Sequence, residues 1–356
     1  MEPTGQKLNS QYKGRMIGLD FLRGVAMMLT LFRHYSFKSP NILWQIGWAG
    51  VHLFFVLSSF LITNILLTEY YKNGKINFGR FFIRRALKIY PLYYLFIITS
   101  VYKNRGLFLS STHYKKQLLG QIFHLQNYTE VLWYHTWSLA AEEHFYLSIC
   151  ILLSVLLYLQ KLQGLTILVC LCLFIVILTP YLRYYNTLNY QAEWFFSTHL
   201  IMDSFAFGAL LAITKFVFPG LFSKIIELKH FLLLPIIIFL LPLFLLPIGN
   251  LIMNSIGMTF MFMGFTLLIA YFQSIENFSR SKNVTVLIFI KPLASIGIAS
   301  YSIYLLHVPV KSIIYPLPIS EQLKIPLYFI ACILVGMVVW YLIEKPIATY
   351  KSNKFS

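Results

Sequence analysis

The sequence predicts an all-α, polytopic integral membrane protein with about ten transmembrane helices and both termini in the cytosol. Of its 356 residues, 58% are hydrophobic and only 12% are charged, whereas a soluble domain carries about 25% charged residues. Apolar stretches long enough to cross a bilayer recur along the chain, and basic residues lie in the short connections between them. One large membrane domain is therefore expected, rather than several soluble ones.

The individual spans follow from the lengths of the uncharged stretches. Residues 42–67, 162–182 and 325–343 contain no Asp, Glu, Lys or Arg, and about 20 helical residues cross the hydrocarbon core. Residues 231–275 are long enough for two helices, with a turn at 247–250. The predicted spans are 17–36, 46–68, 86–102, 144–160, 164–182, 201–218, 231–247, 254–273, 293–313 and 325–343.

The distribution of basic residues predicts the orientation. The net charge is +17, and an even number of spans places 19 Lys and Arg on the side of the two termini against 8 on the other side. Lysine and arginine concentrate in cytosolic loops. We therefore expect a cytosolic tail at 1–15, the membrane domain at 16–346 and a second cytosolic tail at 347–356. The polar, basic N-terminal residues do not resemble a cleavable signal peptide.

Neither a nucleic-acid partner nor a metal site is expected. The positive charge lies between apolar spans, which indicates contact with the anionic headgroups of membrane lipids. The cysteines lie inside apolar stretches without the spacing of metal ligands, and we expect them to pack as small apolar residues. They are Cys150, Cys170, Cys172 and Cys332.

Several ionisable residues fall at or within predicted spans, namely Asp20, Arg23, His34, His52 and Asp203. Charges at membrane depth are costly and usually face a cavity or a partner, so these residues are functional candidates. Other readings stay open. Asp20 and Arg23 are three residues apart and can form a structural ion pair, and His52 can be an interhelical hydrogen-bonding residue.

Arg23 and His34 are expected on one face of the first predicted helix. They are eleven residues apart, close to three full turns, which separates them by about 16 Å along the axis. An arginine near the cytosolic end and a deeper histidine on the same stripe can hold two ends of one long ligand. An acyl-CoA has this form, with anionic phosphates at one end and a reactive thioester at the other.

Residues 135–146 place two carboxylates, Glu142 and Glu143, beside Trp137 and two histidines at the outer membrane edge. The aromatic residues alone fit an interfacial belt, and acidic residues at a helix start can merely complement the helix dipole. The combination of aromatic residues and two carboxylates at the membrane edge indicates a functional region.

Residues 78–91 form a basic segment next to a predicted span. Its arginines, Arg84 and Arg85 in particular, suit the binding of phosphate groups. The alternative is a topology anchor that binds anionic lipid.

Together these segments resemble the acyltransferase 3 family of integral membrane acyltransferases. The resemblance begins at 18–26, where Arg23 precedes His34 at the spacing of a family signature, and it continues in family order. The remaining segments are 50–61, 78–91, 137–146, 203–211, 300–309 and 344–346. From the first to the last, these segments extend over nearly the whole chain.

The resemblance implies an acyl-CoA co-substrate, acetyl-CoA in particular, and no permanently bound cofactor. The implied acceptor is a bacterial envelope glycan, such as a polysaccharide, a lipopolysaccharide or a lipid-linked glycan. The implied location is the bacterial cytoplasmic (inner) membrane, with multiple passes. We expect a stand-alone form without a hydrolase-like domain. His52 stands where the family usually has Asp, and Ser59 where it has Gly, so no role of that Asp is carried over.

The resemblance also implies that His34 is catalytic, that Arg23 is essential and that Glu142 supports catalysis. The expected CoA-binding residues are Arg23, Arg84 and Arg85. Further candidates for binding the acceptor or supporting the site are Asp20, Trp137, Ser138, Glu143, Asp203, Tyr304 and His307.

The predicted activity is O-acyl transfer, most simply O-acetyl transfer, with His34 as general base or as an acylated nucleophile. An unperturbed histidine titrates near 6.5, which suits the role of base. The alternative is a transporter or channel that uses its intramembrane charges for ion or proton coupling. Release of free CoA from acyl-CoA distinguishes the two.

Overall fold

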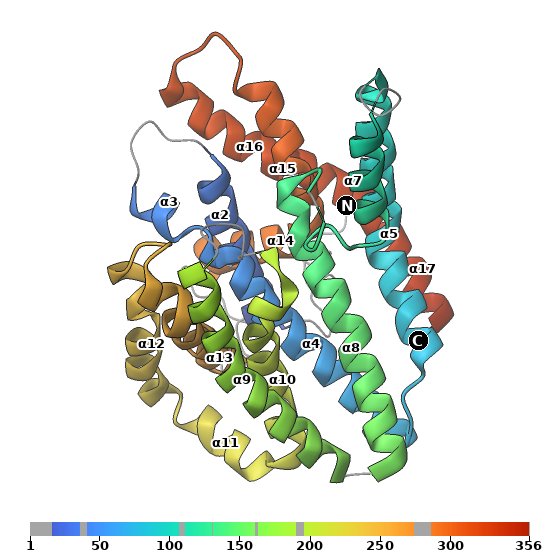
Figure 1. The fold of residues 1–356 in the computed structure, drawn as a ribbon, viewed down its shortest axis with the longest axis vertical. Helices are drawn as coiled ribbons and strands as arrows, with labels where there is room; N and C mark the ends of the chain where they lie inside the picture. Colours follow the sequence, from blue (N-terminus) through green and yellow to red (C-terminus); the bar gives the residue numbers. More distant parts are fainter. Residues whose placement is uncertain are drawn as a thin grey trace, which may run out of the picture.

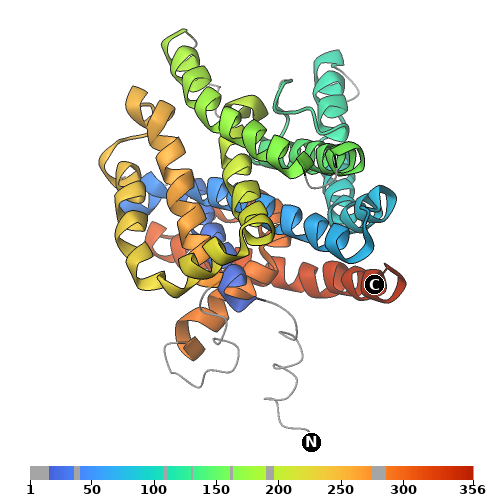
Figure 2. The same cartoon turned by 90° about the horizontal axis from the view of Figure 1, so that it is seen from below.

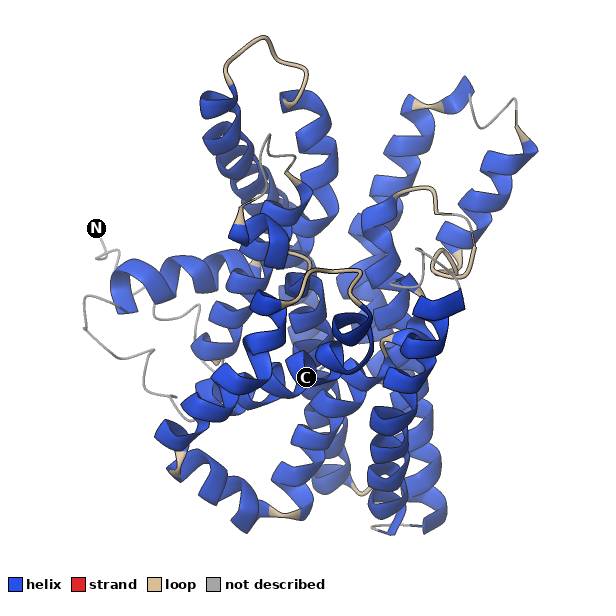
Figure 3. Ribbon diagram, turned by 60° about the vertical axis from the view of Figure 1, so that its left-hand side comes forward, coloured by secondary structure: helices blue, strands red, loops and turns tan. Residues whose placement is uncertain are grey.

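The computed structural model describes residues 16–35, 41–106, 111–129, 131–160, 163–189, 196–273 and 286–355, and these form helices, turns and short connections without a strand (Figure 3). The all-α prediction is confirmed for this part of the chain. The predicted tail at 1–15 lies outside the described residues. The predicted tail at 347–356 is helical to Phe355 and contacts α5, so it is part of the helical body.

Each predicted span contains a helix, in the predicted order. These helices are α2 (Ile17–His34), α4 (Ala49–Asn73), α5 (Phe78–Lys103), α8 (Trp137–Gln160), α9 (Gln163–Asn189), α10 (Met202–Val217), α12 (Leu233–Leu245), α13 (Met258–Gln273), α14 (Lys291–Ile298) with α15 (Ser300–Ile314), and α16 (Glu321–Val339).

Shorter elements connect or extend these helices. They are α3 (Ile42–Ile46), α7 (Thr112–Ile122), η1 (Tyr134–Thr136), η3 (Thr198–Leu200), α11 (Pro219–Glu227), η4 (Lys229–Leu232), η5 (Met253–Gly257), η7 (Val286–Ile290), η8 (Trp340–Glu344) and α17 (Lys345–Phe355).

Five helical segments in the described residues are long and apolar enough to cross a membrane, or up to seven if two bent pairs are each one span. The pairs are α10 with α11, bent by 109°, and the segment Ile288–Ile298 with α15, bent by 78°. The helices α2 and α5 carry several charged residues, and α12 has only 13 residues. The structure therefore supports a multi-pass membrane protein of five to seven spans by length and composition.

The helix α4 lies at the centre of the bundle. Of its most apolar window, 72% is buried inside the protein, compared with 17% for the segment that contains α16. Figure 2 shows α4, in blue, crossing the middle of the molecule. Its face of Val56, Ser59 and Phe60 meets Gly208 of α10 so closely that a Cβ at Gly208 would overlap these atoms. The small residue thus allows the two backbones to approach.

A second close contact holds α2 against α14. A Cβ at Gly24 would overlap the carbonyl of Leu293, and a Cβ at Gly297 would overlap the carbonyl of Asp20. Each helix thus contributes a glycine to the same crossing. This contact fixes the part of α2 that carries Asp20 and Arg23.

The connections lie at two ends of the molecule. Figure 1 shows the α15–α16 connection and α7 at one end, and α11 and the C-terminal end of α8 at the opposite end. The helix α3, which precedes α4, lies toward the end of α7, and the α4–α5 turn lies toward the end of α11. We call these the α7 end and the α11 end.

Candidate functional site

A cavity of about 460 Å³ lies between α2, α4, α5, α8 and α15, and α17 borders it. Cationic side chains dominate its polar lining: Arg23, Arg80, Arg84, Arg85, Lys88 and Lys351. Three carboxylates lie among them, those of Asp20, Glu69 and Glu142. The lining therefore has an excess of positive charge, which suits a ligand with several negative charges.

The cations of α5 reach this cavity because the basic segment is helical from its start. The side chain of Asn77 caps the helix by accepting a hydrogen bond of 2.9 Å from the backbone N–H of Arg80. Arg80, Arg84 and Lys88 follow at four-residue intervals and therefore share one helix face. The predicted span began only at residue 86, so the structure extends the helix to include the arginines.

Two of the arginines are held by neighbouring side chains. Arg80 Nη2 lies 2.8 Å from Oε1 of Glu69 on α4. The guanidinium of Arg85 lies over the ring of Tyr146 on α8, 4.7 Å from its centroid, which favours a cation–π contact. These contacts orient both guanidinium groups before any ligand binds.

The ion pair of Asp20 and Arg23 proposed from the sequence is present but long. Arg23 Nη1 lies 3.9 Å from Oδ1 of Asp20, and both residues line the cavity. A partly exposed ion pair of this length contributes little stability. Both the structural and the ligand-binding interpretations of Arg23 are compatible with this geometry.

The carboxylate of Glu142 is fully engaged at the cavity wall. Oε1 accepts a hydrogen bond of 2.7 Å from the hydroxyl of Ser58, and Oε2 accepts one of 2.9 Å from the hydroxyl of Tyr146. Glu142 thus ties α8 to α4. It is not bonded to His34, whose ring has a different partner.

That partner is His307. Nδ1 of His34 on α2 is hydrogen-bonded to Nε2 of His307 on α15, and the two rings stack with centroids 4.6 Å apart. His307 is fully buried, and its Nδ1 is hydrogen-bonded to the backbone carbonyl of Tyr304 one turn earlier. A third imidazole, that of His135, lies edge-on to His307 with ring centroids 5.3 Å apart.

Tyr304 connects the cavity to the histidine pair. It lines the cavity together with Ser138, and the two hydroxyls are 2.7 Å apart. The Tyr304 hydroxyl also donates to the backbone carbonyl of His135, and its ring centroid lies 5.5 Å from that of His307. The cavity therefore ends one helical turn from the pair of His34 and His307.

Most of the sequence-predicted site residues come together here. Asp20, Arg23, Arg84, Arg85, Ser138, Glu142 and Tyr304 line the cavity, and His34 and His307 form the pair beside it. Trp137 packs in an aromatic group with His52 and Phe55. Glu143 lies toward α5, where the Tyr90 hydroxyl is 3.4 Å from its Oε2.

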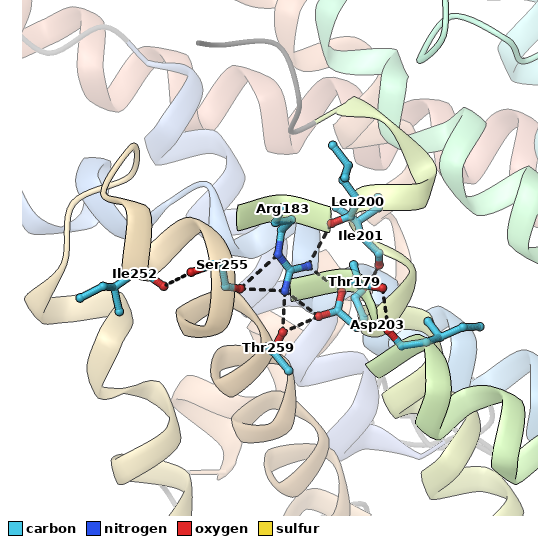
Figure 4. A network of polar contacts seen from close by, with 10 residues as sticks. Thr179, Arg183, Leu200, Ile201, Asp203, Ile252, Ser255 and Thr259 are labelled. Carbon is cyan, nitrogen blue, oxygen red and sulfur yellow. Dashed lines mark hydrogen bonds and ion pairs between the residues drawn. The ribbon is translucent and has the colours of Figure 1, made fainter. Parts of the chain in front are cut away.

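Asp203 lies outside the cavity lining, in a separate network (Figure 4). Its two oxygens are 2.8 and 2.7 Å from the guanidinium of Arg183, and both side chains are fully buried. Thr259 bonds to both partners, and Arg183 also donates to the carbonyls of Leu200 and Ser255. Arg183 lies inside α9, one residue beyond the end of the predicted span 164–182.

The sequence left open an interhelical hydrogen bond for His52. Nδ1 of its ring does not make one, because this atom is buried without a partner. Its ring packs instead among the rings of Trp48, Phe55, Trp137 and Phe262. An apolar aromatic environment surrounds this imidazole.

Sequence reasoning missed several contributors to the site, among them Ser58, Lys88 and Lys351. Ser58 lies within one of the family-like segments, and Lys88 follows Arg84 by one turn, so both had a signal in the sequence. Lys351 had none, because it belongs to a stretch that resembled a tail. No group of three or more His, Cys, Asp or Glu in the described part of the chain could hold a metal ion.

Comparisons with known proteins agree on one class. A family model described as an acyltransferase domain matches residues 16–345. The O-acetyltransferase OatA of Staphylococcus aureus is 28% identical over 376 residues, which covers 96% of this chain and 59% of that protein. The peptidoglycan O-acetyltransferase OatA of Listeria monocytogenes is 33% identical over 158 residues, which covers 40% of this chain and 25% of that protein. No solved structure matches the chain.

Proposed function

Since the chain belongs to this acyltransferase domain family, we propose that it is a membrane O-acyltransferase. It moves an acyl group from cytosolic acyl-CoA to a hydroxyl of a cell-envelope glycan on the outer side of the bacterial cytoplasmic membrane. The observation that carries the proposal is the cation-lined cavity that ends beside the paired imidazoles of His34 and His307.

The proposed topology has about ten spans with both termini in the cytosol. The division of 19 basic residues against 8 supports it. The α4–α5 turn and α11, expected on the cytosolic side, lie at the α11 end, and α7 and the α15–α16 connection, expected outside, lie at the opposite end. In this arrangement the arginines of the cavity face the cytosol.

In the proposed donor complex, the phosphates of acyl-CoA bind Arg84, Arg85 and Arg23. Arg guanidinium groups form paired, charge-assisted hydrogen bonds with phosphate oxygens. Lys88 and Lys351 line the same cavity and add positive charge. The pantetheine arm extends along the apolar side chains of α4 and α8 toward Ser138 and Tyr304, which brings the thioester to the end nearest His34.

The hydrogen bonds of the histidine pair determine which nitrogen of His34 can react. The carbonyl of Tyr304 can only accept, so Nδ1 of His307 carries a hydrogen. In the neutral imidazole Nε2 of His307 is then an acceptor, and Nδ1 of His34 must donate to it. Nε2 of His34 is left with a free lone pair, which is the form required of a base or a nucleophile.

Two reaction routes start from that lone pair. In direct transfer, Nε2 of His34 takes the proton of the glycan hydroxyl. At the same time the hydroxyl oxygen attacks the thioester carbonyl, and the CoA thiolate leaves. In the covalent route, Nε2 attacks the thioester and releases CoA, and the glycan hydroxyl then takes the acyl group from the ring. In both routes, we propose that Glu142 supports the cavity wall and that Asp20 and Trp137 support the residues around it.

The proposed acyl group is acetyl, and the proposed acceptor is peptidoglycan rather than lipopolysaccharide. The names of the relatives support both choices, because one is an O-acetyltransferase and another a peptidoglycan O-acetyltransferase. The chain spans only 59% of the first of these relatives, so the comparison concerns the membrane part that the two chains share.

The test uses the full-length protein in lipid nanodiscs, with acetyl-CoA supplied in solution. Addition of soluble peptidoglycan fragments should increase the release of free CoA thiol and yield O-acetylated fragments in equal amount, as measured by mass spectrometry. A transporter or channel would release no CoA. Thiol release without any acetylated glycan would contradict the proposed acceptor.

A further inference from the structure

A group of buried polar atoms lacks hydrogen-bond partners around Tyr93, away from the cavity described above. The atoms are Oε1 of Gln121, both ring nitrogens of His124, Oε1 of Gln126 and Oε1 of Glu143. Leaving a buried polar atom unpaired is destabilising, and such atoms in native proteins usually bind water or a ligand. Several of them in one place therefore indicate bound water or a ligand.

Tyr93 of α5 holds the group together. Gln121 and Gln126 both donate to its hydroxyl, at 2.8 and 3.4 Å, and the ring of His124 stacks on its ring with centroids 4.6 Å apart. His124 also stacks on Tyr90, with centroids 5.6 Å apart, and Tyr90 contacts the carboxylate of Glu143. The unpaired atoms thus belong to side chains that share two neighbouring tyrosines.

The orientation of both glutamine amides is fixed by their partners. Gln126 Nε2 donates to the backbone carbonyl of Thr136 at 2.9 Å, which can only accept. Gln121 Nε2 donates to the Thr136 hydroxyl at 2.6 Å, and that hydroxyl already donates to the carbonyl of Trp133. Neither amide can be turned without losing these bonds, so both leave a carbonyl oxygen free to accept.

His124 is held in an unusual backbone conformation. Its φ is 55°, the one positive φ of a non-glycine residue in the described chain, and such a conformation is uncommon and often marks a functional residue. Burial, and the nearby His144, lower the pKa of His124 to about 4. The ring is therefore neutral near pH 7 and offers one donor and one acceptor.

The chemistry of the unpaired atoms selects a class of ligand. The side-chain oxygens of Gln121 and Gln126 can only accept hydrogen bonds at these positions, and Glu143 adds a carboxyl oxygen. They suit a ligand rich in hydroxyl and amide N–H groups and disfavour an anionic one. The half-buried ring of Tyr90 beside them provides an aromatic face. An uncharged N-acetylated sugar has both properties.

The same turn that holds the glutamines also contacts the histidine pair. Thr136 accepts from Gln121 and Gln126, while the preceding residue, His135, packs edge-on against His307. We therefore propose that Gln121, His124, Gln126 and Glu143 form a subsite for an uncharged N-acetylated sugar of the acceptor glycan, next to the point of acyl transfer. This inference rests on the proposed function.

The test measures sugar binding separately from acyl transfer. The probe is a fluorescent tetrasaccharide of N-acetylglucosamine, titrated onto the full-length protein in nanodiscs without acetyl-CoA. His124→Asn keeps a residue that tolerates positive φ, and Glu143→Gln keeps the size of the side chain. Each should weaken binding roughly tenfold. His113→Asn, an exposed histidine of α7, is the matched control and should bind as the wild type does.

A tetragalacturonate of the same length should bind more weakly than the N-acetylated probe, because its carboxylates face acceptor oxygens. In acyl transfer, His124→Asn and Glu143→Gln should raise the apparent KM for peptidoglycan fragments by the same factor and leave that for acetyl-CoA unchanged. Thermal unfolding of each variant checks that it is folded, and Gln126→Met provides a third variant if one is not.

The outcomes separate this proposal from the proposed function. The subsite would be overturned if both variants bind the probe as tightly as the wild type does, or if the wild type does not bind it. The unpaired atoms would then hold only water, even if acyl transfer occurs. Weakened binding in both variants would support the subsite even if the wild type releases no CoA, in which case the proposed function alone fails.

Discussion

His34 and His307 are hydrogen-bonded ring to ring, Nδ1 of the first to Nε2 of the second, although they are 273 residues apart in the chain. The fully buried His307 is in turn hydrogen-bonded to the backbone of its own helix. This relationship gives His34 a fixed ring orientation. In the proposed mechanism His34 is the reacting histidine and His307 positions it.

We expect His34→Ala to abolish glycan O-acylation while the protein still folds and binds acyl-CoA. A general base contributes roughly 10²- to 10⁴-fold in rate, and an obligatory acyl carrier contributes nearly all of it. The measurement is O-acetyl content of the glycan together with CoA binding to the purified variant. Wild-type acylation in His34→Ala would exclude the catalytic role, and labelled acyl trapped on His34 without acceptor would identify the covalent route.

We expect His307→Leu to lower kcat on the order of 10²-fold, because a misplaced catalytic group loses about this much, with little change in the KM for acyl-CoA. His307→Gln should recover part of the rate, since its side-chain oxygen can accept from Nδ1 of His34. Steady-state kinetics of the two variants provide the comparison. A purely structural role predicts instead that both variants lose stability and keep the kcat of the folded fraction.

We expect the double variant Arg84→Ala and Arg85→Ala to raise the apparent KM for acyl-CoA roughly 10- to 100-fold, with little change in the KM for the glycan. The reason is the loss of charge-assisted hydrogen bonds to phosphate, each about 1.5–3 kcal/mol. Lys72→Ala, an exposed basic residue of the same end, is the control. If the double variant fails to insert into the membrane while its KM is normal, the segment is a topology anchor.

We expect Asp203→Asn to lower the free energy of unfolding by about 3–5 kcal/mol, because it leaves the charge of Arg183 buried and unpaired. The double variant Arg183→Met and Asp203→Leu should recover much of the loss, since the charge is removed from both sides. Thermal unfolding in detergent measures both. The KM for acyl-CoA of the folded variants should be unchanged, and a specific change in it would give Asp203 a role in the site.

We expect a reporter fused after Ser356 to be cytosolic and one inserted within 103–140 to be external, in line with the distribution of basic residues. Enzymatic or fluorescent reporters that are active on only one side of the membrane provide the measurement. A cytosolic location of the 103–140 segment would place the sugar subsite and the arginines on the same side of the membrane. That result would contradict transfer across the membrane.

Local patterns in the sequence predicted a large part of this structure. Predominantly apolar stretches of sufficient length identified a helix in every predicted span, because hydropathy is a property of consecutive residues. The arginines of α5 were predicted to bind phosphate or anionic lipid, and they line the cavity. The start of α5 was missed by eight residues, since hydropathy does not register a charged, capped first turn such as that after Asn77.

The same local patterns could not predict contacts between segments that are far apart in the chain. Asp203 was a possible site residue, and only the packing of α9 against α10 shows that it pairs with Arg183. Lys351 looked like part of a tail and lines the cavity. The unpaired atoms around Tyr93 have no signal in the sequence, because a missing partner is a property of the surroundings.

The sequence by itself determined the helical membrane architecture, the family and the identity of the reactive histidine candidate, since hydropathy, charge and motif spacing are carried by neighbouring residues. Only the tertiary structure decided that His307, rather than Glu142, is the ring partner of His34, and that Glu142 instead joins Ser58 and Tyr146. The physical reason is that a hydrogen bond requires two groups within about 3 Å. Whether side chains on different helices meet that condition depends on how close packing at small residues, such as Gly24 and Gly297, sets the helices against one another.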